Sequence, residues 1–203
     1  MVVSSGHEHL GHHGLAMRQA EAIAGAGSAR VMFQLREKGL QASRLLDLAS
    51  AIRPVLEGCG SLLLVNERSD IALASRADGV HLTEASCPAV SIRRAFPGML
   101  AGQSVHSAGA AVDAAKSGVD YLLFGPVFAT PSKEAFGPPQ GLHALELACR
   151  AVRIPVFAVG GITPERAFAC IESGAWGVAA IKPFLDVASL TGTIETFNEF
   201  LPA

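Results

Sequence analysis

Charged residues are scarce in this sequence, and neither sign dominates. Only 17% of the 203 residues are charged, and the formal net charge at pH 7 is −2. Nucleic acids and acidic membrane surfaces require a basic face on their protein partner, so this composition argues against both. An anionic ligand must therefore be bound by a few local groups.

Long hydrophobic runs are also missing. Runs such as Ser61 to Val65 fall far short of the roughly 20 residues that span a bilayer. The chain does not open with a charged and then apolar signal segment either. We therefore expect no membrane partner and a cytoplasmic location.

Cysteines are few and widely separated. The four of them, Cys59, Cys87, Cys149 and Cys170, show no paired spacing. The spacing therefore indicates neither a zinc ribbon nor a disulfide framework. We expect reduced thiols, with Cys149 and Cys170 buried.

What the sequence does contain is a regular alternation of strand and helix patterns. Half of the residues are hydrophobic, which suits one domain over residues 1–203 with a sizeable core. Seven apolar runs recur at a spacing of roughly 20 to 35 residues, each followed by a helical pattern, and Val2–Val3 would make an eighth strand. Such alternation predicts parallel strands with right-handed crossovers, and eight of them favour a (β/α)8 TIM barrel over an open doubly wound sheet.

The expected helices follow from apolar spacing and end signals. Ser69 is the predicted N-cap of one helix, with Asp70 in its first turn. The predicted helical segments are 15–26, 40–56, the stretches after Ser69 and Pro88, 110–118, 142–152 and 186–201.

Two adjacent glycines end the apolar run that starts at Val156. Gly160 and Gly161 precede Thr163-Pro164-Glu165, a typical helix start. Glycine lets the backbone approach a ligand closely, and a second run ends about twenty residues later at Ile181-Lys182. The backbone amides at these two strand ends would then bind one phosphate, as barrels often do. The alternative is a sheet-edge turn without a ligand, because such glycine pairs are weak motifs.

Polar residues follow most of the predicted strands. Because the C-terminal ends of parallel strands share one rim, these residues are expected to face one pocket. Their cations, hydroxyls and amides indicate a small phosphorylated ligand, although each charge alone is more simply a solvated loop residue. The candidates are Gln34, Arg36, Lys38, Asn66, Glu67, Ser86, Ser104, His106, Thr130, Ser132, Lys133, Gly160, Gly161, Ile181 and Lys182.

His106 is the candidate proton carrier, because histidine alone in this set has an unperturbed pKa near neutrality. A structural role is the competing interpretation. His81 lies inside an apolar strand and is interpreted as packing. The histidines at positions 7, 9, 12 and 13 lie close together; they predict either a solvated loop over the fold or a transition-metal site.

Several of these segments together resemble one family, which holds thiamine-phosphate synthase and thiazole tautomerase. The matching segments are QLREK at 34–38, VNERSDIALASRADGVHL at 65–82, GQSVHS at 102–107, DYLLFGPVFATPSK at 120–133, VFAVGGI at 156–162 and GVAAIK at 177–182. They occur in the family's order and cover most of the chain between Gln34 and Lys182.

The resemblance implies a role for each matched position. In the synthase, residues like Gln34, Arg36, Lys38, Asn66, Ser104 and Lys133 hold an aminopyrimidine pyrophosphate. Residues like Thr130, Ser132, Gly161, Ile181 and Lys182 hold a thiazole phosphate.

Two aspartates of the synthase bind Mg²⁺, and here Glu67 and Ser86 stand at those positions. Ser86 brings no charge, so the metal site departs from the family's pattern. In the tautomerase, which needs no metal, a histidine like His106 moves a proton on a carboxylated thiazole phosphate.

Three functions follow as hypotheses. The first is a cofactor-free thiazole tautomerase with His106 as general acid/base. The second is a Mg²⁺-dependent thiamine-phosphate synthase, in which Glu67 would be the metal ligand; the intact QLREK segment favours it. The third is a catalytically silent barrel that binds thiazole phosphate or thiamine phosphate. A homo-oligomer is compatible with each.

Overall fold

The computed structural model describes residues 1–6, 14–26, 31–130 and 138–199. Strands and helices alternate along the chain, and the eight strands are parallel, which is the (β/α)8 TIM-barrel fold expected from the sequence. The chain divides into two compact units: the first comprises Met1–His81 and Ile181–Glu199, and the second comprises Leu82–Ala180. The organisation of residues 1–203 as a single domain stays a prediction.

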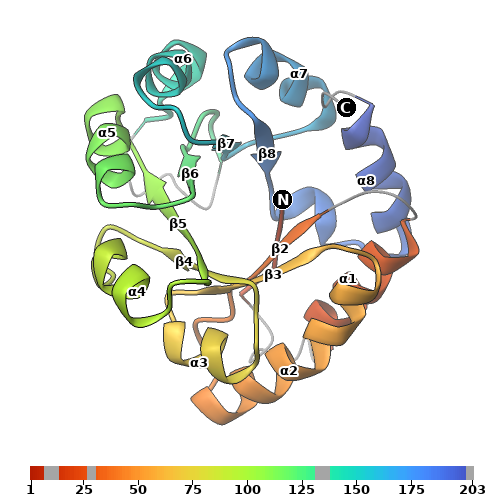
Figure 1. Cartoon of the computed structure of the whole chain (residues 1–203). Coiled ribbons are helices and arrows are strands. Elements are labelled where there is room, and N and C mark those ends of the chain that lie inside the picture. The colour runs from red at the N-terminus through yellow and green to blue at the C-terminus, as the bar shows by residue number, and fades with distance from the viewer. Residues whose placement is uncertain (7–13, 27–30, 131–137, 200–203) are drawn as a thin grey trace. The chain divides into compact units, whose positions relative to one another are not determined.

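The first unit contains β1 (Val2–Val3), β2 (Met32–Leu35), β3 (Leu62–Asn66) and most of β4 (Gly79–Leu82), with α1 (Leu15–Gly25), α2 (Ala42–Gly58), α3 (Ser69–Ala74), two 3-10 turns (Lys182–Phe184 and Val187–Ser189) and α8 (Leu190–Asn198). Phe33 of β2 pairs with Val2 of β1 and Leu63 of β3. The consecutive residues Leu63, Leu64 and Val65 are all fully buried, as in parallel strands covered on both faces. Helix α1 packs against α2 and α8 (Figure 1).

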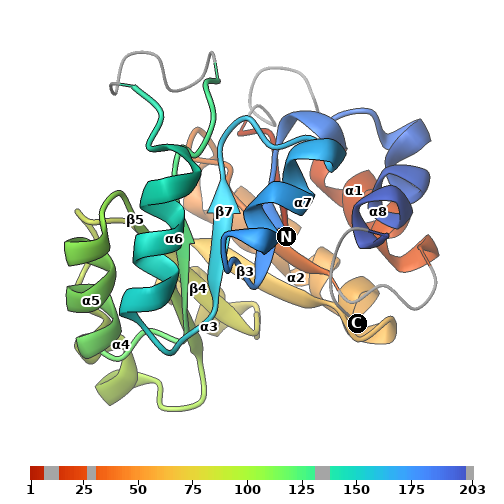
Figure 2. The same ribbon diagram turned by 90° about the horizontal axis from the view of Figure 1, so that it is seen from above.

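The second unit contains α4 (Ala89–Ala95), β5 (Leu100–Val105), α5 (Ala108–Lys116), β6 (Tyr121–Phe124), α6 (Gly141–Ala151), β7 (Val156–Val159), α7 (Pro164–Glu172) and β8 (Gly177–Ala179). Leu123 of β6 pairs with Ser104 of β5 and Phe157 of β7. Helices α5 and α6 pack side by side (Figure 2). The C-terminal ends of β5, β6 and β7 are thereby fixed relative to one another.

Two strand glycines of this unit make room for aromatic rings. A Cβ atom on Gly102 would lie 1.9 Å from Cζ of Tyr121, and one on Gly177 would lie 2.9 Å from Cε1 of Phe157. The Tyr121 and Phe157 rings meet edge to face at 5.7 Å between centroids, a favourable aromatic geometry. The sheet therefore needs glycine at both positions.

Side-chain caps fix the helices that follow β5 and β7. The Ala110 N–H donates to Oγ of Ser107 over 3.1 Å, and the Arg166 N–H donates to Oγ1 of Thr163 over 3.4 Å. Each cap satisfies a backbone donor that the first helical turn leaves without a partner. Both caps lie one or two residues after candidate site residues, His106 and Gly161.

Some helix boundaries differ from the sequence prediction. Helix α8 begins at Leu190 rather than Asp186, because Asp186 accepts the Ala188 N–H at 3.1 Å and caps a separate 3-10 turn. Ser69 is the first helical residue of α3, and its N-cap is Arg68.

The burial of the cysteines is partly as predicted. Cys170 is buried, whereas Cys149 is only half-buried. Burial raises the pKa of the Cys149 thiol to about 11 and that of the Cys170 thiol to about 12, so both thiols remain protonated and uncharged at neutral pH. No helix in the described part of the chain is long and apolar enough to cross a membrane.

Candidate active site

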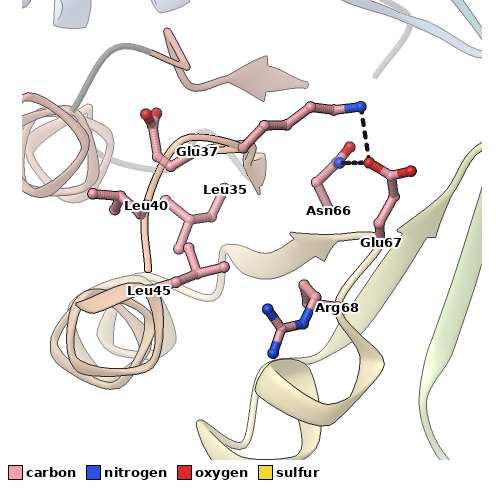
Figure 3. A pocket seen from close by; sticks show the side chains of 8 residues that line it. Leu35, Glu37, Leu40, Leu45, Asn66, Glu67 and Arg68 are labelled. Atoms are coloured by element: carbon pink, nitrogen blue, oxygen red, sulfur yellow. Dashed lines mark hydrogen bonds and ion pairs between the residues drawn. The ribbon is translucent and has the colours of Figure 1, made fainter. Parts of the chain in front are cut away.

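Four predicted site residues of the first unit form a connected network at the ends of β2 and β3. Nε2 of Gln34 donates to Oδ1 of Asn66 over 2.8 Å, and Nδ2 of Asn66 donates to Oε2 of Glu67 over 2.9 Å. Nζ of Lys38 lies 2.9 Å from the same carboxylate oxygen. Figure 3 shows the two contacts of Glu67 as dashed lines. We call Gln34, Lys38, Asn66 and Glu67 the β2–β3 network.

Glu67 occupies a left-handed backbone conformation, with φ of 61°. The Arg68 N–H donates to the Asn66 carbonyl over 2.7 Å, which closes a three-residue γ-turn with Glu67 at its centre. The Glu67 N–H donates to the His81 carbonyl over 2.8 Å. This conformation is costly for a residue with a Cβ atom, and such strain is characteristic of functional sites.

Gln34 carries a buried acceptor. The residue is 2% exposed, and its Oε1 accepts no hydrogen bond from the residues that the structure describes. A buried amide oxygen of this kind is costly unless a donor reaches it. Its position in the β2–β3 network makes a ligand amino group a suitable donor.

Sequence reasoning missed Glu37, which is 3% exposed. Its carboxylate accepts the Gly6 N–H at 3.0 Å, and the Arg36 N–H donates to Oγ of Ser4 over 2.8 Å. These bonds tie the segment after β1 to the segment after β2. The alternation of Leu35 and Glu37 with Gln34, Arg36 and Lys38 was the available signal, because alternate residues of an extended segment point to opposite sides.

A cavity of about 300 Å³ borders the β2–β3 network. Its walls combine apolar and charged side chains, which Figure 3 shows: Leu35, Glu37, Lys38, Leu40, Leu45, Asn66, Glu67 and Arg68. A mixed lining of this kind suits a ligand with a flat apolar part and a charged part.

His81 lies in the wall of the first unit, as the sequence predicted, and is 1% exposed. Burial lowers its pKa to about 4; the Arg36 charge adds to this, and the Glu67 carboxylate opposes it. His81 is therefore a neutral packing residue at physiological pH.

In the second unit, His106 follows β5 and is exposed. Its Nδ1 forms a hydrogen bond with the Gly125 carbonyl. A carbonyl oxygen only accepts, so Nδ1 carries the proton, and in the neutral imidazole Nε2 carries the lone pair. His106 therefore has a basic atom at Nε2, and its role as general acid/base stays a prediction.

Gly160 and Gly161, which we call the glycine turn, contact another part of the same unit. Both are left-handed, with φ of 97° and 64°. A Cβ on Gly160 would lie 2.5 Å from Cβ of Pro126, and one on Gly161 would lie 2.7 Å from the Ala129 carbonyl oxygen. Close packing against residues 125–130, which we call the β6 loop, thus requires both glycines, whether or not a phosphate binds.

Ile181 and Lys182 belong to the first unit, where Lys182–Phe184 forms a 3-10 turn rather than the end of a strand. Nε2 of the buried Gln19 donates to the Phe184 carbonyl over 2.7 Å and fixes this turn. The glycine turn belongs to the second unit. Joint binding of one phosphate by these segments stays a prediction.

Ser86 forms hydrogen bonds within its own loop. The Thr83 N–H donates to Oγ of Ser86 over 2.9 Å, and the Ser86 N–H donates to the Thr83 carbonyl over 3.1 Å. Among the described residues, no group of three His, Cys, Asp or Glu side chains is placed to hold a metal ion. Ser132, Lys133 and the N-terminal histidines at positions 7, 9, 12 and 13 lie outside the described residues.

The sequence is related to curated thiamine-phosphate synthases. It is 42% identical over 182 residues to the thiamine-phosphate synthase of Methanoculleus marisnigri, covering 89% of this chain and 86% of that protein. It is 45% identical over 161 residues to a putative thiamine-phosphate synthase of Geobacter sulfurreducens, covering 79% of this chain and 75% of that protein.

Solved structures support the same relationship. The thiamine phosphate pyrophosphorylase of Pyrococcus furiosus superposes with a TM-score of 0.84 at 26% identity, covering 98% of this chain and 93% of that one. A 3-hexulose-6-phosphate synthase, 16% identical with a TM-score of 0.73, shares the fold. The thiamine monophosphate synthase family model matches residues 1–184. By these matches, the chain belongs to the thiamine monophosphate synthase family of thiamine biosynthesis enzymes.

Proposed function

We propose that this protein is a Mg²⁺-dependent thiamine-phosphate synthase, which joins an aminopyrimidine pyrophosphate to a thiazole phosphate. The observation that carries the proposal is the β2–β3 network, in which hydrogen bonds and an ion pair connect Gln34, Asn66, Glu67 and Lys38. The family resemblance assigns Gln34, Asn66 and Lys38 to the pyrimidine substrate, and Glu67 stands at one of the metal-binding positions. The curated relatives named as thiamine-phosphate synthases support this function over the tautomerase.

The two cations that follow β2, Arg36 and Lys38, would bind the pyrophosphate. Lys38 is half exposed, with 51% of its side chain accessible, and Glu67 is 32% accessible. A pair this exposed contributes at most about 1 kcal/mol. Lys38 can therefore exchange the Glu67 carboxylate for a phosphate oxygen at little cost, and Arg36 supplies a second positive charge.

The aminopyrimidine would be recognised by Gln34. Its Oε1 is buried and accepts no bond from the described part of the chain, so an amino group of the substrate would satisfy it. Its Nε2 is already held by Asn66 at 2.8 Å. This bond fixes which end of the amide faces the ligand.

The residues present fit a magnesium ion that the substrate helps to hold. Mg²⁺ in such sites needs one or two carboxylates together with substrate phosphates, and Glu67 supplies one carboxylate beside the cationic Lys38. When bound, the ion would neutralise charge on the departing pyrophosphate. Ser86, whose hydroxyl is used in its own turn, would add no charge, so Glu67 carries the protein's share.

The thiazole phosphate would be held largely by backbone groups. The family resemblance assigns it to Thr130, Ser132, Gly161, Ile181 and Lys182. The left-handed conformation of Gly161 orients successive amides as an anion-binding turn requires. Ser104 and Lys133 would complete the pyrimidine side.

A direct assay tests this function. Purified protein, MgCl₂, aminopyrimidine pyrophosphate and thiazole phosphate should yield thiamine phosphate. We expect Glu67→Gln to lower kcat/KM by about 100-fold or more, because the metal loses its protein carboxylate. The matched control is Glu57→Gln, which removes an exposed carboxylate on α2 that pairs with Arg53. Binding of both substrates without product at any Mg²⁺ concentration would instead favour a silent binding protein.

Thiazole tautomerase is the second candidate, and His106 favours it. Its Nδ1 is fixed on the Gly125 carbonyl, which leaves Nε2 as the basic atom. Under this alternative, the wild type isomerises a carboxythiazole phosphate and His106→Gln abolishes this turnover. If the protein is only a synthase, the carboxythiazole phosphate is not isomerised, and His106→Gln retains thiamine phosphate formation.

A further inference from the structure

Arg166 is a cation in an unexpected place. It is the third residue of α7, after the N-cap Thr163, and the N-terminal turn of a helix disfavours positive charge. The sequence pattern predicts no role for it. Because it lies next to the glycine turn, we expect its contacts there to offset this unfavourable position.

The guanidinium of Arg166 contacts two segments at once. Nη1 donates to the Gly161 carbonyl over 2.7 Å. The guanidinium carbon lies 4.8 Å from the centroid of the Phe128 ring, within the range of a cation–π contact. One side chain therefore connects the glycine turn to the β6 loop.

Near the start of the β6 loop, Pro126 and Val127 accept hydrogen bonds from the start of α6, whereas Phe128 contacts the glycine turn and Arg166. The Gln140 and Gly141 N–H groups donate to the carbonyls of Pro126 and Val127 over 2.8 and 3.0 Å, and the Val127 N–H donates to Val159 over 2.8 Å. Beyond this point, the Phe128 N–H donates to the Gly160 carbonyl over 3.0 Å. The Phe128 ring packs against the Arg166 guanidinium, two residues before Thr130, a candidate phosphate ligand.

We infer that Arg166 is a positioning residue for thiazole-phosphate binding: it clamps Phe128 against the glycine turn and so fixes Thr130 and the Gly161 amide relative to each other. This inference rests on the proposed synthase function. A planar guanidinium can donate to a carbonyl in its plane while its face covers an aromatic ring, which a lysine ammonium cannot do. The clamp depends on this shape rather than on charge alone.

The test compares Arg166→Met and Arg166→Lys with Arg150→Met, which removes an exposed arginine that pairs with Glu146 on α6. For both Arg166 variants we expect the KM for thiazole phosphate to rise about tenfold, with the KM for aminopyrimidine pyrophosphate changed less than about twofold. Arg150→Met should leave both unchanged. Recovery of the wild-type KM in Arg166→Lys would overturn the inference, because charge alone would then suffice.

Amide hydrogen exchange gives a readout that does not depend on the reaction. In Arg166→Met we expect the Phe128 amide to exchange about tenfold faster, while the Val127 amide keeps its rate. Phe128→Leu, which removes the ring but not the cation, should reproduce this change. Unchanged exchange at Phe128 overturns the clamp whether or not the protein is a synthase. Faster exchange and weaker thiazole-phosphate binding in a protein that makes no thiamine phosphate would support the clamp and reject the synthase function.

Discussion

The ends of β2 and β3 differ from the ends of β6 and β7 in what carries their chemistry. In the first unit, amide, carboxylate and ammonium groups bond to one another through the β2–β3 network. In the second unit, the close contacts involve backbone atoms and two glycines with positive φ. The first region depends on which side chains are present, and the second depends on a side chain being absent.

This difference determines how each region should respond to substitution. A side-chain network loses one contact at a time, so its variants should show graded effects. A backbone turn with no room for a Cβ atom should lose its structure with a single substitution, because its neighbours are backbone and Cβ atoms, which cannot rotate away. The expected changes in the free energy of unfolding decrease from the glycine turn to the β2–β3 network.

Gly161→Ala should have the largest effect. The new Cβ would lie 2.7 Å from the Ala129 carbonyl oxygen, and the alanine would have to adopt a φ of 64°. We expect a loss of about 4 kcal/mol in the free energy of unfolding, measured by urea titration. Gly192→Ala in α8 is the control, since a Cβ there meets nothing within 4 Å and alanine favours a helix. Equal effects at the two positions would contradict the proposed contrast.

His81 should make stability depend on pH below neutrality. Its pKa is lowered to about 4 in the folded protein, so between pH 6.5 and about 4 the unfolded chain binds one more proton than the native state. Stability should therefore fall as pH falls through this window, by about 3 kcal/mol in total. His81→Gln should lack this component of the slope in urea titrations at several pH values, whereas replacement of the exposed His143 should retain it. Identical slopes in all three proteins would show that burial does not suppress His81 protonation.

Asn66→Ala should cost about 2 kcal/mol of unfolding free energy, because it removes two side-chain hydrogen bonds from a residue that is only 8% exposed. The loss also leaves Nε2 of the buried Gln34 without its acceptor. Gln34→Leu in the Asn66→Ala background should recover part of this loss, since it removes the amide that has lost its partner. Strictly additive effects would mean that the two residues are not coupled.

Glu67→Gly should have the smallest effect on stability, and in the opposite direction. Glycine adopts φ of 61° without strain, so we expect the variant to be more stable by about 1 kcal/mol. Synthase activity should be lost together with the carboxylate. Glu67→Ala, which removes the same carboxylate but keeps a Cβ atom, should show no such gain. A destabilised Glu67→Gly variant would indicate that the contacts of the carboxylate outweigh the backbone strain.

The fold was predictable because local apolar patterns indicate the alternation of strands and helices. The buried run at Leu63–Val65 and the caps before α5 and α7 are examples of signals that act over a few residues. The late start of α8 was not predictable in the same way. It depends on whether Asp186 caps a 3-10 turn or an α-helix, and the two have the same sequence signal.

The site was predictable at the level of residue types but not of partners. Gln34, Lys38, Asn66 and Glu67 were expected near one another, and the structure connects them. Glu37 and Arg166 were missed, because the roles of a buried carboxylate and of a stacked guanidinium depend on segments far away in the chain, Gly6 and Phe128. Gly160 and Gly161 were expected to let the backbone approach a ligand closely, and the structure shows that they allow close contact with the protein's own β6 loop.

The ring of Tyr121 occupies the space that a side chain on Gly102 would fill. The two positions therefore share one volume between neighbouring strands, and neither can be exchanged freely on its own. A larger residue at 102 demands a smaller one at 121, so a chain that acquires both changes has to pass through an intermediate with either a collision or a void.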